Sequence, residues 1–212
     1  MEAGRKRHNR PPPHEPTIRP EQTLTELTNA VLAIVKERGL SFSEQPLKLA
    51  SGELSHDFID GKAALSRGAD LGTAGQAMLE LAKRLDIEFD AVGGLTLGAD
   101  HFAHIIAYLG GRDWFTVRKA VKGRGTNKRV EGADLNAGTR VLLVDDVVTT
   151  GGSIREAYEE ILKIGATVAG AITLVDRGET AGRYFQEVGV PYGALVTYRD
   201  LDIKPVGGLL DA

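Results

Sequence analysis

Short apolar runs alternate with amphipathic patterns along most of the chain. Five runs rich in β-branched and other apolar residues predict buried strands at residues 89–93, 114–117, 141–144, 168–175 and 194–197. Between them, apolar residues recur at helical spacing in residues 71–85, 100–109, 153–164 and 180–188. Near-continuous apolar strands that alternate with helices are typical of a parallel sheet covered on both faces. The sequence therefore predicts an α/β fold with a doubly wound parallel sheet, whose ligand binds beyond the carboxyl ends of the strands.

The first 21 residues differ from the rest. They hold five basic residues, five prolines and almost no apolar side chains. This composition predicts a disordered tail, with a basic arm for an acidic partner as the alternative. From Thr23 onward, apolar residues recur at helical spacing up to Gly39, which predicts a first helix and its end. Residues 22–212 are therefore predicted to form a single domain.

Composition excludes several classes of protein. The 212 residues carry a net charge of −3, which argues against nucleic-acid binding over the whole surface. The chain has no cysteine, so a disulfide scaffold, a thiolate nucleophile and cysteine-based metal sites are excluded. No apolar stretch approaches the roughly 18 residues of a membrane span, and the N-terminus lacks an apolar signal region. We expect a cytoplasmic protein that does not enter a membrane.

Residues 141–153, VLLVDDVVTTGGS, combine a strand, two acids and a turn rich in glycine and hydroxyl groups. Glycines let backbone N–H groups approach an anion, and the start of the following helix adds unpaired donors. Asp145 and Asp146 suit a vicinal diol, or Mg²⁺ held directly or through water. The segment thus predicts a site for a ribose 5-phosphate. The alternative is an ordinary helix N-cap with acidic neighbours.

This segment resembles the phosphoribosyl pyrophosphate signature of the type I phosphoribosyltransferases. The resemblance implies that fold, with a small N-terminal hood. It also implies that Asp145 and Asp146 face the ribose hydroxyls. The 5-phosphate would be wrapped by the residues that follow, which are Val147, Val148, Thr149, Thr150, Gly151, Gly152 and Ser153.

Two segments nearer the N-terminus resemble orotate phosphoribosyltransferases. Residues 47–62, LKLASGELSHDFIDGK, are similar to the hood segment of that family, and the hood would span about residues 40–66. There Phe58 would stack on a planar base or belong to the core, and Lys48 lies two residues before Ala50, where some members carry a base-contacting lysine. Residues 92–103 resemble the pyrophosphate loop of actinobacterial-type members, with Leu97 and Gly98 in its turn. Some relatives place a lysine at Gly98, and a tight structural turn is the alternative.

Residues 117–132, VRKAVKGRGTNKRVEG, hold six cations and one acid, Glu131. A flexible cationic loop suits an anionic transition state, whereas a solvated hairpin or a nucleic-acid patch is the alternative. The family's loop is similar: Arg118, Lys119 and Lys122 match, but Arg124 stands where the family has histidine. Arginine does not exchange a proton near neutral pH. The resemblance also implies a homodimer in which loop 118–132 reaches the neighbour's site.

Arg177 follows the strand at 168–175 and matches an arginine that reads orotate in the family, as Thr149 matches another orotate contact. Alternatively, Arg177 pairs with Asp176 or Glu179 at the surface. The sequence thus predicts a magnesium-dependent orotate phosphoribosyltransferase-like enzyme of pyrimidine synthesis. A phosphoribosyltransferase with another acceptor and a non-catalytic nucleotide-binding regulator are the alternatives. The predicted catalytic residues are Lys119, Lys122, Arg124, Asp145 and Asp146.

Overall fold

A six-stranded sheet forms the centre of the computed structural model, which describes residues 22–49, 51–120 and 128–207. Its strand order is β5-β4-β3-β6-β7-β8, and all neighbours are parallel except the edge strand β5. The strands are β3 (Ala91–Leu95), β4 (Asp113–Val117), β5 (Val130–Gly132), β6 (Arg140–Val148), β7 (Thr167–Asp176) and β8 (Tyr192–Thr197). The predicted α/β fold with a mainly parallel sheet is confirmed.

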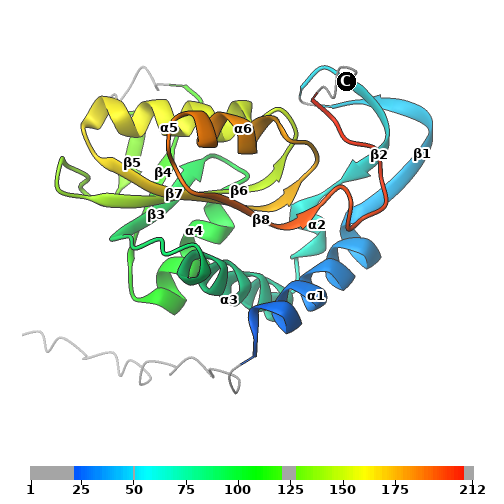
Figure 1. The fold of residues 1–212 in the computed structure, drawn as a ribbon, viewed down its shortest axis with the longest axis horizontal. Coiled ribbons are helices and arrows are strands. Elements are labelled where there is room, and N and C mark those ends of the chain that lie inside the picture. The colour runs from blue at the N-terminus through cyan, green and yellow to red at the C-terminus, as the bar shows by residue number, and fades with distance from the viewer. Residues whose placement is uncertain (1–21, 50, 121–127, 208–212) are drawn as a thin grey trace, which may run out of the picture.

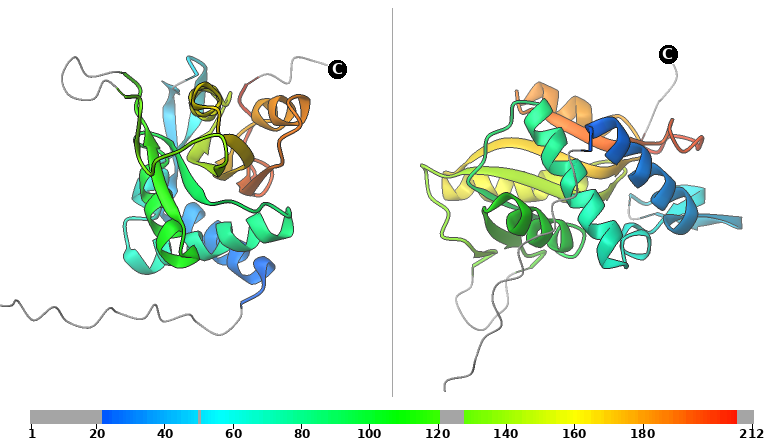
Figure 2. Two further views of the ribbon diagram at one scale, coloured as in Figure 1. Left: turned by 90° about the vertical axis from the view of Figure 1, so that its left-hand side faces the viewer. Right: turned by 90° about the horizontal axis from the view of Figure 1, so that it is seen from below.

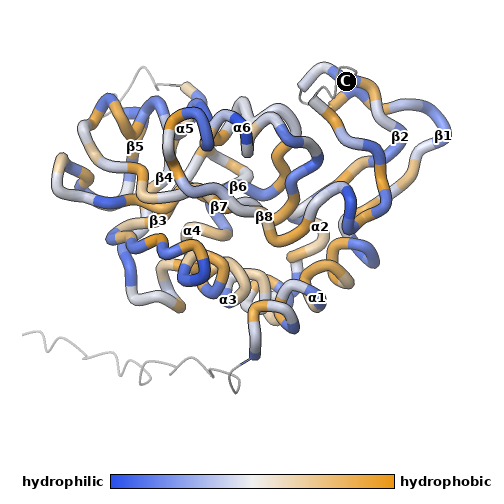
Figure 3. Tube along the Cα trace, viewed as in Figure 1, coloured by the Kyte–Doolittle hydropathy of each residue, from blue (hydrophilic) through white to orange (hydrophobic). Residues whose placement is uncertain are grey.

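Helices cover both faces of the sheet (Figure 1). One face carries α5 (Gly152–Ile164) and α6 (Thr180–Glu187). The other carries α1 (Leu24–Ile34), α3 (Gly68–Arg84) and α4 (Asp100–Gly110), which lie side by side (Figure 2). The helices predicted from periodicity are all present. Apolar residues gather along the strands and on the helix faces toward them (Figure 3), so the sheet separates two hydrophobic cores.

The first helix begins at a capping box. Thr23 Oγ1 accepts a hydrogen bond from the Glu26 N–H, and the Glu26 carboxylate accepts one from the Thr23 N–H. Leu27 and Val31 form the buried face of α1, and the helix continues as a π-helical turn, η1 (Val35–Gly39). The predicted helix with its end at Gly39 is confirmed.

A small two-stranded ribbon stands apart from the sheet. It consists of β1 (Leu40–Lys48) and β2 (Leu54–Ile59), which are antiparallel and lead into α2 (Gly61–Ala64). These elements lie in the range predicted as the hood. Arg177, directly after β7, donates from Nη1 to the Asp57 carbonyl at 3.0 Å and from Nη2 to Ser55 Oγ at 3.1 Å. The ribbon is therefore fastened at the carboxyl end of the sheet, beside β8 (Figure 1).

Strand β6 is longer than its apolar run. The prediction ended it at residue 144 and placed the two acids after the strand, whereas β6 extends to Val148. Backbone pairing with β7 continues past the apolar run, from Asp145 opposite Thr173 to Val148 opposite Asp176. Pairing uses main-chain groups, so it does not end where apolar side chains end. Asp145 and Asp146 are thus held in the strand itself.

Among the described residues, no helix is both long and apolar enough to cross a bilayer.

Candidate active site

Two acids and a glycine turn meet at the carboxyl edge of the sheet. Asp145 is 5% exposed, and the turn after β3 brings Gly98 against it. A Cβ added at Gly98 would lie 2.7 Å from Asp146 Oδ1 and would also collide with Asp145 Oδ1. Glycine allows this approach without any shift, whereas a lysine at position 98 would have to displace both carboxylates. The structure therefore brings together the predicted acids and the turn that holds Leu97 and Gly98.

The ionised form of the Asp145 carboxyl group is disfavoured by its surroundings. Burial, together with repulsion from Asp146, raises its pKa. The Asp146 N–H donates to Asp145 Oδ1 at 3.0 Å, but no cation is paired with Asp145 within the described parts of the chain. The Asp146 carboxylate is better compensated, because its Oδ1 accepts from the Val147 N–H at 2.7 Å and its Oδ2 accepts from Lys62 Nζ at 2.9 Å.

The loop after β6 starts helix α5 without side-chain help. Its N-cap is Gly151, with φ 79°, and no described side chain caps the helix. Residues other than glycine rarely adopt this backbone φ. A Cβ at position 151 would also lie 3.0 Å from the Ala181 Cβ. Thr149, Thr150 and Ser153 therefore do not serve as the helix N-cap, which was the alternative role for this segment. The start of α5 keeps backbone donors available for an anion.

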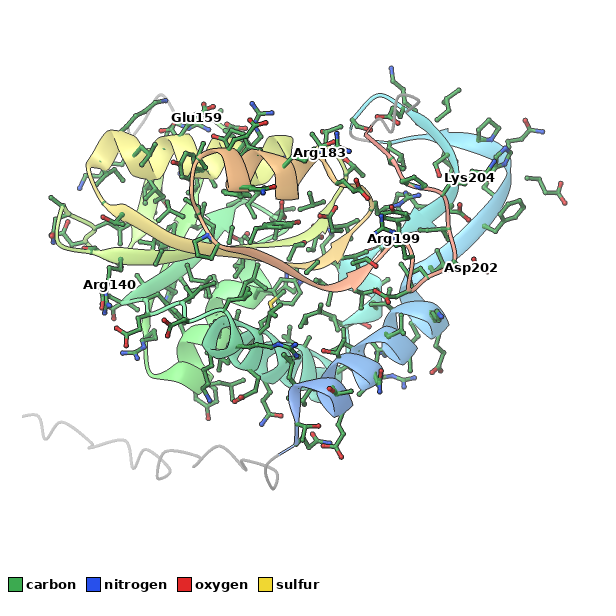
Figure 4. The ribbon with its side chains drawn as sticks, viewed as in Figure 1. Arg140, Glu159, Arg183, Arg199, Asp202 and Lys204 are labelled. Carbon is green, nitrogen blue, oxygen red and sulfur yellow. The ribbon has the colours of Figure 1, made fainter. Side chains whose placement is uncertain are left out.

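Arg177 is 1% exposed and faces the hood rather than its sequence neighbours. The alternative of a surface ion pair is wrong. Asp176 accepts from the Tyr192 hydroxyl at 2.8 Å and from the Gly178 N–H at 3.0 Å. Glu179 pairs with Arg183 of α6 and Arg199 after β8 (Figure 4).

Burial lowers the pKa of Arg177, and its Nε has no hydrogen-bond partner in the described structure. A buried donor without a partner is rare, and bound ligands are one explanation for it.

Two further predicted base-contacting residues lie in the ribbon. Phe58 is 40% exposed, so its alternative assignment to the core is wrong. Lys48 is exposed at the end of β1, and its side chain makes no hydrogen bond or ion pair with any described residue, Arg177 included.

The cationic segment is partly neutralised. Arg118 Nη1 lies 2.7 Å from Glu131 Oε1, and Arg129 pairs with both Glu156 and Glu160 of α5. Arg129 also donates from Nε and Nη2 to the Arg118 carbonyl, at 2.9 and 2.8 Å. Lys119 is exposed, whereas Lys122 and Arg124 lie outside the described residues. The segment is therefore less strongly cationic than its six basic residues suggested, because acids distant in sequence pair with Arg129.

Comparison with known proteins agrees with this geometry. The family described as "Phosphoribosyl transferase domain" matches residues 78–186, which contain both acids, the loop after β6 and Arg177. Orotate phosphoribosyltransferase of Streptomyces coelicolor is 38% identical over 175 residues, covering 80% of this chain and 93% of the relative. The chain belongs to the orotate phosphoribosyltransferase family. The enzyme of that name from Aquifex aeolicus is 37% identical over 174 residues, covering 79% and 93%.

Solved orotate phosphoribosyltransferases have the same fold. The Mycobacterium tuberculosis enzyme in complex with phosphoribosyl pyrophosphate superimposes with a TM-score of 0.68 at 30% identity, covering 84% of this chain and 99% of that one. The same enzyme in complex with Fe(III) dicitrate gives a TM-score of 0.71 at 31% identity, with the same coverage.

Several residues of this orotate phosphoribosyltransferase site were missed from the sequence. Lys62 lies in the hood segment, and nothing in the sequence places it beside Asp146. His101, in the first turn of α4, has a buried Nε2 without a partner in the part of the chain that is described, and burial lowers its pKa. The segment after β8 was missed as well: the Val206 N–H donates to the Arg177 carbonyl at 2.7 Å, and Thr180 Oγ1 donates to the Gly207 carbonyl at 2.6 Å.

Proposed function

We propose that this chain joins orotate to phosphoribosyl pyrophosphate and releases orotidine 5′-phosphate and pyrophosphate, a step of pyrimidine synthesis. The observation that carries the proposal is the convergence of Asp145, Asp146 and Gly98 at the sheet edge from which the 149–153 loop leaves. Buried Arg177 follows the neighbouring strand at the same edge. Membership of the orotate phosphoribosyltransferase family supports the same reaction.

Each part of the sugar phosphate has a complementary group in the site. Backbone N–H groups at the start of α5 and the hydroxyls of Thr149, Thr150 and Ser153 would bind the 5-phosphate. Asp145 and Asp146 would accept hydrogen bonds from the ribose hydroxyls. The backbone of the turn at Leu97 and Gly98 would bind the pyrophosphate, with Arg118 and Lys119 adding positive charge. Lys122 and Arg124 are assigned the same task from the family resemblance alone.

Mg²⁺ fits the acidic pair as an ion shared with the substrate. The described residues contain no cluster of three or more His, Asp or Glu side chains that could hold a metal by themselves. The carboxylates of Asp145 and Asp146 would therefore hold the ion together with the substrate. Mg²⁺ is commonly held by one or two carboxylates together with substrate phosphates and water. The raised pKa of Asp145 reflects a negative charge that a cation would stabilise. When bound, the ion supplies positive charge to the pyrophosphate.

Arg177 would orient the acceptor. Orotate carries a carboxylate on a planar ring, and an arginine side chain has five N–H donors in a fixed fork. Two of these bind Asp57 and Ser55, so Nε–H and the second hydrogen of each Nη are free for the acceptor among the contacts described. The acidic ring nitrogen of orotate gives up its proton to solvent and attacks the anomeric carbon. The new C–N bond forms as the C–O bond to pyrophosphate breaks, and the electron pair leaves with pyrophosphate.

We also propose a homodimer in which loop 118–132 reaches the neighbour's site. The base of this loop supports the idea, because β5 pairs with β4 and the Arg118 N–H donates to the Arg129 carbonyl at 2.8 Å, so the loop leaves from a fixed hairpin. Mixing inactive Lys119→Ala with inactive Asp145→Asn protein would restore activity if the loop acts across the dimer. No recovery in a mixture shown by native mass spectrometry to exchange subunits would contradict it. The cytoplasmic location stays a prediction.

One assay tests the reaction. Purified protein with Mg²⁺, phosphoribosyl pyrophosphate and orotate should lose orotate absorbance and release one pyrophosphate per orotate consumed. A panel of other bases and acids should give much slower release. If another acceptor is preferred, the orotate assignment is wrong. Binding of phosphoribosyl pyrophosphate without pyrophosphate release for any acceptor would favour the non-catalytic regulator.

A further inference from the structure

Lys62 is the one described side chain that forms an ion pair with either acid of the site. It stands in the short helix α2 of the hood, whose start is fixed because Asp60 Oδ1 accepts from the N–H groups of Lys62 and Ala63, both at 3.0 Å. A Cβ on Gly61 would lie 3.1 Å from the Asp146 Cβ, so the backbone of α2 rests directly against Asp146. Lys62 Nζ then lies 2.9 Å from Asp146 Oδ2. The sequence separation of the pair is 84 residues.

The same carboxylate is approached from its other oxygen by the glycine turn. A Cβ at Gly98 would lie 2.7 Å from Asp146 Oδ1, so a side chain at this position would have to displace the carboxylates, and the glycine itself brings no positive charge. Lys62 places an ammonium group beside Asp146 from the opposite element, the hood. Two elements therefore meet at one carboxylate: the turn contributes backbone and Lys62 contributes charge.

The exposure of Lys62 argues against a purely structural role. Its side chain is 57% exposed, and exposed ion pairs contribute little to stability. The lysine stem is flexible and its ammonium has three rotatable donors. A lysine ammonium is charged at neutral pH. Such a group can leave a carboxylate and bind a more highly charged phosphate nearby.

We propose that Lys62 is a catalytic residue that binds the pyrophosphate group of phosphoribosyl pyrophosphate and stabilises it as it departs, supplying the cation that the turn lacks at Gly98. The proposal rests on the proposed function, since it names a further residue of the same site. Negative charge grows on pyrophosphate as the C–O bond breaks, so a cation placed there binds the transition state more tightly than the substrate.

Calorimetry on the full-length protein tests this assignment with three ligands at fixed ionic strength and Mg²⁺. Lys62→Ala should weaken phosphoribosyl pyrophosphate and pyrophosphate by about 10- to 100-fold, the usual range for a lost charged hydrogen bond. Ribose 5-phosphate, which lacks the pyrophosphate, should bind to Lys62→Ala within about twofold of its affinity for wild type. In a separate turnover assay, kcat of Lys62→Ala should fall. Lys62→Arg should recover most of the affinity because it keeps the charge. Lys62→Met keeps the length of the stem and serves if the alanine variant does not fold.

Lys83→Ala is the matched control. Lys83 Nζ lies 2.6 Å from Glu80 Oε1 and its side chain is 70% exposed, but it stands in the last turn of α3, outside the site. All three affinities should match wild type in this variant. If the wild-type protein turns over and Lys62→Ala binds pyrophosphate with unchanged affinity, the role of Lys62 is overturned and the proposed function is not. An equal loss for ribose 5-phosphate would also overturn it, because the contact would then be to the sugar phosphate. Wild-type protein that neither binds phosphoribosyl pyrophosphate nor turns over would instead refute the proposed function.

Discussion

Strand β6 begins with Arg140 at one edge of the sheet and carries Asp145 and Asp146 toward the other. At the amino edge, Arg140 Nη1 lies 2.8 Å from Glu88 Oε2 and Nη2 lies 3.0 Å from Asp90 Oδ1. The Arg140 N–H also donates to Asp90 Oδ2 at 2.9 Å. At the carboxyl edge, five residues along the same strand, Asp145 is buried without a bonded cation among the described residues.

The two edges shift carboxyl pKa values in opposite directions. Hydrogen bonds from Arg140 lower the pKa of Asp90 to about 2, whereas burial and the neighbouring Asp146 raise that of Asp145. The amino edge pairs its charges with each other. At the carboxyl edge no described cation is bonded to Asp145, and Arg177 Nε and His101 Nε2 have no hydrogen-bond partner in the described structure. Buried polar groups left uncompensated at one edge are typical of a functional site.

The largest expected effect comes from neutralising both acids. Asp145→Asn with Asp146→Asn should weaken phosphoribosyl pyrophosphate at least about 100-fold by calorimetry, because the ribose and metal contacts are lost together. Thermal stability should be unchanged or higher, since a buried repulsion is removed. Asp90→Asn is the control at the other edge and should bind normally. Equal loss of affinity in both proteins would remove the distinction between the edges.

Arg177→Lys should give the next effect. Lysine keeps the charge but cannot bind Asp57, Ser55 and a planar acceptor at once. KM for orotate should rise by about 10-fold, in line with one lost charged hydrogen bond, while KM for phosphoribosyl pyrophosphate changes little. Steady-state kinetics in both substrates would check this. A selective rise in KM for phosphoribosyl pyrophosphate would mean that Arg177 does not face the acceptor.

Arg129→Ala should slow turnover more moderately. The substitution removes the hydrogen bonds to the Arg118 and Lys119 carbonyls and leaves the largely buried Glu160 with Lys163 alone. We expect kcat to fall by about 10-fold, since losing the positioning of charged groups costs on the order of 1.4 kcal/mol, with orotate KM unchanged. Arg183→Ala, which removes a more exposed arginine ion pair on α6, should retain wild-type kcat. A loss of thermal stability without any change in kcat would show that Arg129 only supports the fold.

The smallest effect is expected at Asp90, and it depends on pH. Because the folded pKa of about 2 lies below the ordinary value of 3.8, the ionised carboxylate stabilises the fold above about pH 4. That contribution should disappear as pH falls through about 2. Asp90→Asn should therefore lower Tm slightly at pH 7, and the difference from wild type should vanish toward pH 2, as measured by scanning calorimetry. A Tm difference that does not depend on pH would contradict the pairing with Arg140.

Sequence patterns predicted the parts of this molecule that are buried. The five apolar strands and the helices between them were found because a parallel sheet covered on both faces leaves a continuous apolar signal. The ribbon β1–β2 leaves no such signal, because Phe42 and Leu54 are exposed on it and most of its residues face solvent. Strand β5 was hidden in the cationic segment for the same reason.

Within the site, contiguous motifs were predictable and long-range pairs were not. Asp145, Asp146 and the 147–153 loop follow one strand, so their order in the chain carries the information. Lys62 reaches Asp146 through the packing of the hood, and Arg129 reaches Glu156 and Glu160 through the packing of α5. Such contacts are set by tertiary structure, which a local pattern does not encode.

A crystal structure of the protein with phosphoribosyl pyrophosphate and Mg²⁺ would show where the substrate binds. We expect the ribose at Asp145 and Asp146, the 5-phosphate at the start of α5 and the pyrophosphate against the Gly98 turn. Lys62 Nζ should have moved from Asp146 to a pyrophosphate oxygen. Substrate bound away from the carboxyl edge of the sheet would contradict the assignment of the active site.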